Sequence, residues 1–289
     1  MKNILIVGCG DIAKRVAPLL HHGYRLFGLV RDSSVVAELH ARSITPIFGD
    51  LDFRDSLTRI DGLADIVLHF APPPNAGELD TRTRNLLAAL SHGTLPDRLI
   101  YISTSGVYGD CGGVVIRETH RLNPQSLRAM RRADAENRIR RWAQRNRVNA
   151  SILRVPGIYS TERLPLELLR TGSPVIVAAQ DSYTNHIHAD DLARIVIAAL
   201  RNGKPNRVYH ACDNSELLMG DYFDEVADAL HLAHPPRLSR DQVKRTVTPS
   251  LWSFMNESRK LTNSRIKKEL RVKLRYPTVA DALHSSFLY

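Results

Sequence analysis

The residues Ile4 to Ala13 read I-L-I-V-G-C-G-D-I-A, an apolar run that opens into a Gly-x-Gly-x-x-Ala spacing. The run predicts a buried strand that ends at Val7, and the glycines predict a tight turn into a helix. In such a turn Gly8 permits the sharp change of direction and Gly10 lets the backbone approach a ligand, while Ala13 keeps the helix close to the sheet. The order strand, turn, helix predicts a dinucleotide-binding site, with an ordinary Gly-rich turn as the alternative.

The start of the predicted helix is where we expect the pyrophosphate of such a ligand. Backbone N–H groups of the first helical turn, among them those of Asp11 and Ile12, lack partners within the helix and carry partial positive charge. They would therefore bind a phosphate group. The sequence predicts that the side chain of Cys9, inside the turn, is there because it is small.

The second predicted strand indicates which dinucleotide is bound. It reads R-L-F-G-L-V-R from Arg25 to Arg31. A site for NAD places a carboxylate near the end of this strand, to hold the ribose 2′-hydroxyl. Arg31 occupies that position here, and its planar guanidinium matches the oxygens of a 2′-phosphate. We therefore predict NADP(H) in preference to NAD(H), with a solvated Arg31 as the alternative and Asp32 as the cap of the next helix.

Strands and helices alternate along the first half of the chain. Apolar patterns predict strands at 3–8, 25–31, 45–48, 65–70, 97–103 and 149–154, with helices at 11–21, 34–41, 79–92 and 125–146. This alternation is typical of an α/β, Rossmann-type parallel sheet with helices on both faces. We expect a nucleotide-binding domain at 1–155 and a smaller, substrate-side C-terminal region at 156–289, some of whose elements return to the core. Strands at 174–178 and 206–211 and helices at 190–201 and 218–231 are expected there.

The composition limits the class of protein. The 289 residues are 43% apolar, which is enough for a sizeable core, and no apolar run approaches the length of a membrane span. No signal peptide is readable at the N-terminus. Three cysteines without metal-ligand spacing suit a reducing compartment. We expect a cytoplasmic protein with no membrane partner and no metal.

The net charge of +10 raises the question of nucleic-acid binding. Arginines are concentrated between 128 and 147, but apolar residues alternate with them as in an amphipathic helix with a charged outer face. Trp142 is the one aromatic residue in this stretch, and no recognised nucleic-acid motif accompanies the arginines. We predict no nucleic-acid partner and a small-molecule substrate that is polar or anionic.

Several further motifs point to a known family. They are Tyr101 to Asp110 (Y-I-S-T-S-G-V-Y-G-D), Asp50-Leu51, Phe70-Ala71-Pro72, Ile152 to Tyr159 (I-L-R-V-P-G-I-Y) and His186 to Leu192 (H-I-H-A-D-D-L). With these motifs the whole chain resembles the extended short-chain dehydrogenase/reductases of the NAD(P)-dependent epimerase/dehydratase type. Segments around Glu257 to Leu261 and Glu269 to Pro277 resemble the C-terminal part of one atypical subgroup. The resemblance implies that Asp50, Leu51, Phe70, Ala71, Pro72 and Pro156 line the cofactor.

The catalytic pair of this family is replaced in the sequence. Ordinary members use a Tyr-x-x-x-Lys pair, and counting back from Ala135-Glu136 places Arg128 and Arg132 at those two positions. The resemblance implies that Thr104 holds the substrate oxygen and that Asp80 stands where the family has an asparagine. Arg132 is expected to hold the cofactor ribose, and Arg128 to bind an anionic group of the substrate.

Arginine stays charged in proteins and is no ordinary proton donor, so another residue must supply the acid. The candidates are Tyr108, Tyr159, Tyr183, His186 and His188. Of these, we expect Tyr108 to pack structurally and His188 to bond to the backbone.

Two functions remain open from the sequence. The first is an NADP-dependent epimerase, dehydratase or reductase for a polar or anionic substrate such as a nucleotide sugar, which the resemblance favours. The second is a catalytically silent NADP-binding redox sensor or regulatory partner, which the lost Tyr/Lys pair favours. The sequence also leaves open whether the protein forms a homodimer.

Overall fold

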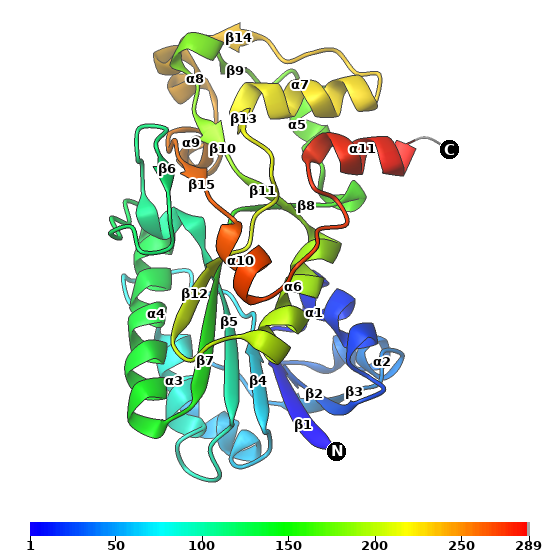
Figure 1. Ribbon diagram of the computed structural model, residues 1–289, viewed down its shortest axis with the longest axis vertical. Helices are drawn as coiled ribbons and strands as arrows, with labels where there is room; N and C mark the ends of the chain where they lie inside the picture. Colours follow the sequence, from blue (N-terminus) through cyan, green and yellow to red (C-terminus); the bar gives the residue numbers. More distant parts are fainter. Residues whose placement is uncertain (288–289) are drawn as a thin grey trace.

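The computed structural model describes residues 1–287 and has a seven-stranded sheet at its centre (Figure 1). The strands lie in the order β12-β7-β5-β4-β1-β2-β3, and every neighbouring pair is parallel. Their bounds are β1 Lys2–Val7, β2 Tyr24–Val30, β3 Ile44–Phe48, β4 Ile66–His69, β5 Arg98–Thr104, β7 Asn149–Val155 and β12 Arg207–His210. The predicted Rossmann-type α/β fold is confirmed.

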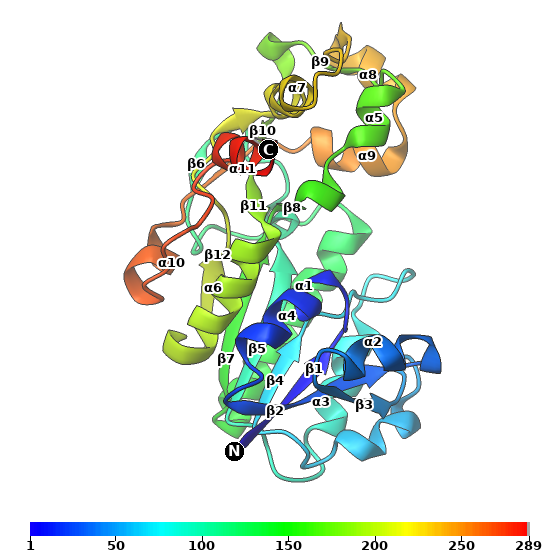
Figure 2. The ribbon, with the colours of Figure 1, turned by 90° about the vertical axis from the view of Figure 1, so that its right-hand side faces the viewer.

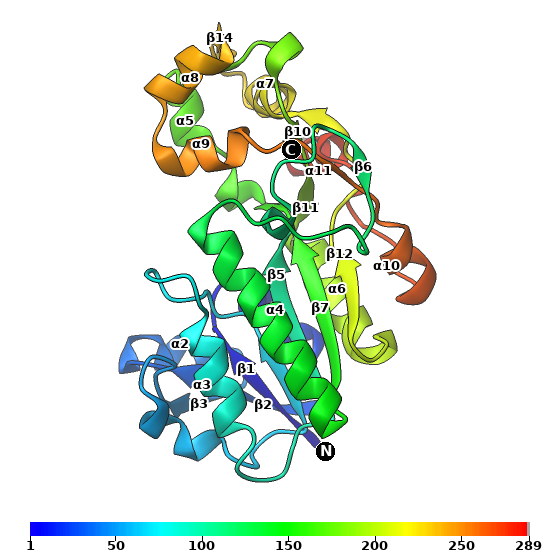
Figure 3. The same cartoon turned by 90° about the vertical axis from the view of Figure 1, so that its left-hand side faces the viewer.

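Helices cover both faces of the sheet, so the strands are apolar on both sides. Ile4 and Ile6 of β1 point into one core cluster, with α1 (Asp11–Val16) and α6 (Ala189–Asn202). Leu5 and Val7 point into the other cluster, with α3 (Thr81–Ala89) and α4 (Leu127–Asn146). Figure 2 shows α1 and α6 on their face, and Figure 3 shows α3 and α4 on the opposite one.

The predicted elements of the first 155 residues are present, with differences at their ends. The predicted helix 11–21 is α-helical only to Val16 and continues as a 3-10 helix, Ala17–Leu19, that contains Pro18. The predicted helix 34–41 is a 3-10 turn, Ser33–Val35, followed by α2 (Val36–His40). A further 3-10 helix, Arg54–Ile60, was not predicted, because its short apolar spacing has no clear period.

A second lobe lies beyond the carboxyl ends of the strands (Figure 1). Its helices are α5 Leu166–Arg170, α7 Met219–Ala229, α8 Arg240–Thr246, α9 Pro249–Met255 and α11 Val279–Phe287. Its short strands are β9 Val175–Ile176, β10 Tyr183–Thr184, β13 Leu217–Leu218 and β14 Arg237–Leu238. Apolar side chains of these helices form a core cluster separate from those of the sheet, Phe223, Val226 and Met255 among them.

The chain returns to the sheet after residue 155. β12 adds the seventh strand beside β7, and α6 packs against the core cluster that includes β1. The remaining short elements join the two lobes: β6 Val115–Ile116, β8 Gly157–Tyr159, β11 His186–His188, β15 Lys260–Leu261 and α10 Ser264–Glu269. The domain boundary at 155/156 stays a prediction. Among residues 1–287, no helix has both the length and the apolar character that crossing a membrane requires.

Candidate functional site

The Gly-rich turn lies at the carboxyl end of β1, in the middle of the sheet. Gly8 has a φ of +99°, and a Cβ there would lie 2.4 Å from the backbone N of Ala71, so only glycine fits. A Cβ built on Gly10 meets no atom within 4 Å. The space in front of Gly10 is therefore open to a ligand, and the turn fits the pyrophosphate of a dinucleotide.

Cys9 in this turn points away from that space. Its Sγ lies 3.7 Å from the carbonyl oxygen of Ile6 and 3.8 Å from that of Leu29. Burial raises the pKa of the Cys9 thiol to about 11. The side chain is thus a small neutral group, as the sequence predicts.

A cavity of about 260 Å³ opens beside the turn, where the adenosine end of the cofactor is expected. It brings together six of the predicted cofactor residues: Gly8, Arg31, Asp50, Leu51, Ala71 and Pro72. The other predicted contacts, Gly10, Asp11, Ile12, Ala13, Phe70, Arg132 and Pro156, lie outside its lining. Phe70 instead packs against the core cluster that includes β1.

Arg82 is a second cation in this cavity, and the sequence did not single it out. It comes from α3 and makes a two-pronged ion pair with Asp52, at 2.8 Å and 2.6 Å. Only the packing of α3 against the loop after β3 brings Arg82 here. Asp32 also lines the cavity, where its carboxylate caps the next turn by accepting from the backbone N of Ser34 at 2.9 Å. The hydrogen bond from the Ser34 hydroxyl lowers the pKa of Asp32 most, and the bond from the Ser34 backbone lowers it further.

A second cavity, of about 430 Å³, lies between the sheet and the second lobe. Three predicted site residues line it, Thr104, Arg128 and Pro156. Thr104 ends β5, and its Oγ1 accepts a hydrogen bond of 3.2 Å from the backbone N of Gly106. Its own O–H proton is free to donate. We call this space the Thr104 cavity.

Cations from distant segments meet in the wall of the Thr104 cavity. Arg128 of α4 lies over the ring of Phe254, 4.4 Å from its centroid. Burial, and then the charge of Arg132, lower the pKa of Arg128. Arg163 and Arg259 complete the set, and Arg259 pairs with Glu257 at 2.7 Å. Arg163 and Arg259 were not assigned from the sequence, although Glu257 and Arg259 stand in a quoted motif.

Arg132 is bound to the sheet itself. One guanidinium nitrogen donates to the carbonyl oxygen of Ile102 at 2.8 Å and to the hydroxyl of Tyr101 at 3.0 Å. The same nitrogen lies 3.4 Å from the carbonyl oxygen of Ala71, a residue that lines the adenosine-side cavity. Arg132 thus lies beside the adenosine-side cavity, and its contact with a ribose stays a prediction.

Asp80 caps α3. Its carboxylate accepts from the backbone N and from the hydroxyl of Thr83, both at 2.9 Å. Burial raises its pKa. The side chain lies outside the linings of both cavities, so the structure does not bring it to Thr104.

Tyr108 belongs to a buried network that holds the fold. Its hydroxyl accepts from Arg154 at 2.6 Å and contacts Nε2 of His210 at 2.5 Å. Arg154 also pairs with Glu136 at 2.6 Å, which joins β7 to α4. Burial raises the pKa of Tyr108 to about 12. Two quoted family motifs, Ala135-Glu136 and the turn that contains Arg154, meet in this network.

His188 and Tyr159 are also tied into the structure. Nδ1 of His188 accepts from the backbone N of Asp190 at 3.2 Å and caps α6, as predicted for this residue. The hydroxyl of Tyr159 contacts Asp213 at 3.4 Å and Thr278 O at 3.3 Å. Burial raises the pKa of Tyr159 and lowers that of His188.

Tyr183 and His186 are the candidate acids that line the Thr104 cavity. His186 is buried and its ring stacks on Tyr222, with centroids 4.0 Å apart. Burial lowers the pKa of His186 to about 3, so the ring is neutral at neutral pH. Tyr183 lies under the ammonium group of Lys260, 4.6 Å from the ring centroid.

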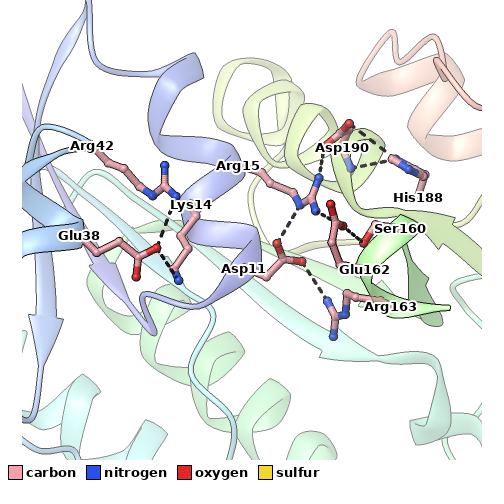
Figure 4. Close-up of polar contacts among 10 residues, drawn as sticks. All are labelled: Asp11, Lys14, Arg15, Glu38, Arg42, Ser160, Glu162, Arg163, His188 and Asp190. Carbon is pink, nitrogen blue, oxygen red and sulfur yellow. Dashed lines mark hydrogen bonds and ion pairs between the residues drawn. The ribbon is translucent and has the colours of Figure 1, made fainter. Parts of the chain in front are cut away.

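A charged cluster begins at Asp11, the residue after Gly10 of the Gly-rich turn (Figure 4). Asp11 and Arg15 of α1 meet Arg163 and Glu162 of the 3-10 helix Thr161–Arg163, together with Asp190 of α6. Within residues 1–287, no three His, Cys, Asp or Glu side chains are placed to hold a metal ion.

Comparison with known sequences identifies the family. The profile of the NAD dependent epimerase/dehydratase family matches residues 4–212. Human dTDP-D-glucose 4,6-dehydratase is 23% identical over 171 residues, which cover 53% of this chain and 49% of that protein. The chain spans about half the length of the curated relatives it matches.

Solved structures share the fold over the whole chain. A functionally unknown conserved protein from Silicibacter pomeroyi DSS has a TM-score of 0.80 at 26% identity, covering 99% of this chain and 98% of that one. The dTDP-glucose 4,6-dehydratase DesIV from Streptomyces venezuelae, solved with NAD and TYD bound, has a TM-score of 0.78 at 20% identity, covering 99% and 96%. The family that the motifs resemble is confirmed: the chain belongs to the NAD dependent epimerase/dehydratase family.

Proposed function

We propose that the chain is an NADP(H)-dependent oxidoreductase of the epimerase or dehydratase type, acting on an anionic small molecule of the nucleotide-sugar class. The observation that carries the proposal is the Thr104 cavity. It joins Thr104, at the carboxyl end of a central strand, to Arg128 in the wall. Ligands of open α/β sheets bind at this edge, and the arginine offers a bidentate partner for a phosphate or carboxylate.

The preference for the 2′-phosphorylated cofactor is supported by the adenosine-side cavity. Arg31 and Arg82 both line it. The Asp32 carboxylate, the group best placed to hold a ribose 2′-hydroxyl instead, is engaged in capping by Ser34. Arg82 is already paired with Asp52, so Arg31 is the cation that supports an additional phosphate.

The protein's own residues divide the chemistry between them. The nicotinamide, when bound, supplies the hydride acceptor or donor. Thr104 donates its free O–H to the reacting oxygen of the substrate, because its lone pair already accepts from Gly106. Arg128 holds an anionic group of the substrate. Tyr183 exchanges the proton, since His186 is held neutral and the other candidates are engaged elsewhere.

A catalytically silent NADP-binding protein is the second candidate. It is favoured by the replacement of Tyr and Lys by Arg128 and Arg132, and by the structural bonds of Tyr108, Tyr159 and His188. On this alternative the Thr104 cavity would bind a ligand without turning it over.

Substitution of Thr104 separates the two candidates. Thr104→Val keeps the shape and removes the donor, so turnover of a nucleotide-sugar panel should fall about 100-fold, while NADPH affinity is unchanged. Thr171→Val removes an exposed hydroxyl just after α5 and is the matched control. Equal turnover in Thr104→Val and Thr171→Val would contradict the assigned role, and no turnover in the wild type would favour the silent protein.

A further inference from the structure

In the charged cluster around Asp11 and Arg15, the carboxylates are unevenly shared between the two arginines (Figure 4). Arg15 reaches three carboxylates, those of Asp11 at 2.8 Å, Glu162 at 3.2 Å and Asp190 at 2.5 Å. Arg163 reaches the carboxylate of Asp11 alone, at 3.2 Å. Asp11 is therefore shared by two arginines, and Arg163 is the weakly held member.

The position of Asp11 places this cluster at the expected cofactor. Asp11 follows Gly10, and the space in front of Gly10 holds no atom within 4 Å of a Cβ built there. Asp11 is thus the residue next to the space that fits a pyrophosphate, and its carboxylate is held by Arg15 and Arg163. The two negative charges of a diphosphate in that space would be repelled by the nearby carboxylate of Asp11.

The positive charge of Arg163 can offset this repulsion, because its side chain is partly exposed and long enough to change position. Its side chain is 42% exposed, and it also lines the Thr104 cavity. The guanidinium sits 3.2 Å from the carboxylate of Asp11, so a change of rotamer in a long side chain can bring it to an adjacent phosphate. Arg15 remains on Asp11 when Arg163 leaves, which keeps that carboxylate neutralised.

We infer that Arg163 is a diphosphate-binding residue that Asp11 holds ready beside the Gly-rich turn. Without cofactor, Arg163 pairs with Asp11. With cofactor, Arg163 binds the pyrophosphate as a charge-assisted partner and closes the wall between the turn and the Thr104 cavity. The inference rests on the proposed binding of NADP(H) at the turn and adds the residue that connects it to the substrate cavity.

The two members of the pair have effects of opposite sign on cofactor affinity. Arg163→Ala removes the cation and should raise the dissociation constant of NADPH by about 10- to 100-fold, the scale of a charge-assisted hydrogen bond. Asp11→Asn removes the competing negative charge and releases Arg163, so it should lower that constant several-fold. A pair that only fastens the loop to α1 would behave differently, because both variants would then lower the melting temperature and neither would tighten binding.

The test is a fluorescence titration of NADPH into the wild type, Arg163→Ala, Arg163→Lys, Asp11→Asn and the control Arg170→Ala, an exposed arginine on α5. Melting temperatures of the same proteins are measured in parallel. Arg163→Lys should bind between the wild type and Arg163→Ala, because lysine keeps the charge but loses the planar fork. Arg170→Ala should match the wild type.

Two probes assign the diphosphate. Adenosine 2′-monophosphate has no pyrophosphate, so its affinity should be the same in the wild type and in Arg163→Ala. Uridine diphosphate stands in for a nucleotide-sugar substrate. Loss of uridine diphosphate binding in Arg163→Ala with unchanged NADPH affinity would overturn the inference and assign Arg163 to the substrate. Absence of NADPH binding in the wild type would instead overturn the proposed function together with the inference.

Discussion

Arg31 is the residue on which the proposed preference for NADP(H) rests. The side chain follows β2, where a carboxylate would select NAD, and it lines the adenosine-side cavity with Arg82. The carboxylate of Asp32 is one position later and is engaged by the backbone of Ser34. These neighbours support the proposed binding of a 2′-phosphate in preference to a 2′-hydroxyl.

Arg31→Ala tests this preference. The variant should weaken NADPH binding by about 1.5–3 kcal/mol, the scale of a charge-assisted hydrogen bond, and leave NADH binding unchanged. Isothermal titration with both cofactors measures the difference. Arg25→Ala, an exposed arginine near the other end of β2, is the matched control. Equal losses for the two cofactors would place Arg31 away from the 2′-phosphate.

Gly10 offers a second test at the residue scale, with a matched glycine elsewhere. A Cβ at Gly10 or at Gly23 meets no atom within 4 Å, so the fold tolerates a side chain at either position. Only at Gly10 would the new side chain enter the space expected to hold the pyrophosphate. Gly10→Val should abolish NADPH binding, while Gly23→Val should keep it, with similar melting temperatures for both. Unchanged NADPH affinity in Gly10→Val would show that the turn does not bind the cofactor.

At the scale of elements, buried polar groups tie the strands to the segments that cover them. Glu136 of α4 pairs with Arg154 of β7, and both side chains are buried. Asp213, after β12, contacts Tyr159 at the end of β8, whose hydroxyl reaches the carbonyl of Thr278 before α11. The Glu136–Arg154 pair joins α4 to the sheet, and the contacts of Tyr159 connect the sheet to the second lobe.

Asp213 predicts a pH dependence of stability. Burial raises its pKa to about 7. A folded-state pKa above the unfolded value means that the folded protein binds the extra proton, so this contribution is full in acid and is lost as pH rises toward 7. The substitution Asp213→Asn mimics protonated Asp213, because an amide N–H and a carboxyl O–H can both donate to the hydroxyl of Tyr159.

The corresponding measurement is denaturant unfolding of the wild type and Asp213→Asn at pH 5 and pH 8. The free energy of unfolding of the wild type should fall relative to that of Asp213→Asn from pH 5 to pH 8, by about 2.5 kcal/mol. Asp55→Asn, at an exposed position, should follow the wild type at both values. A constant difference between the wild type and Asp213→Asn would mean that Asp213 is ionised in the folded protein at both pH values.

At the scale of the whole molecule, the sequence predicts what is local and repetitive. Apolar strands buried on both faces and the Gly-x-Gly-x-x-Ala turn carry their own signals, and the sheet follows from them. Arg163 meets Asp11 from 152 residues away, and Arg82 reaches its cavity only through the packing of α3. Contacts of this kind depend on the tertiary arrangement of surface loops, so no periodic pattern in the sequence predicts them.

Residue roles taken from a family motif also need the surrounding structure. Asp80 stands where the family has an asparagine, yet its carboxylate caps α3 and lies outside the Thr104 cavity. Tyr108 follows Thr104 in the same motif, yet its hydroxyl joins Arg154 and His210. A motif fixes the sequence distance between two residues, while the fold decides which of them face the same space.

The account holds that the two cavities form one working site, with NADP(H) at the Gly-rich turn and an anionic substrate beside Thr104. The most direct measurement is the stopped-flow absorbance of reduced nicotinamide during the first turnover, after the wild-type protein, loaded with NADP⁺, is mixed with each of a panel of nucleotide sugars, together with analysis of the sugar products. An epimerase or dehydratase takes a hydride from the sugar and returns it within the same cycle, so at least one sugar should give a transient rise in that absorbance or be converted to a product. NADP⁺ binding with neither a transient rise nor a changed sugar across the panel would contradict the account and leave a protein that binds the cofactor but does not use it.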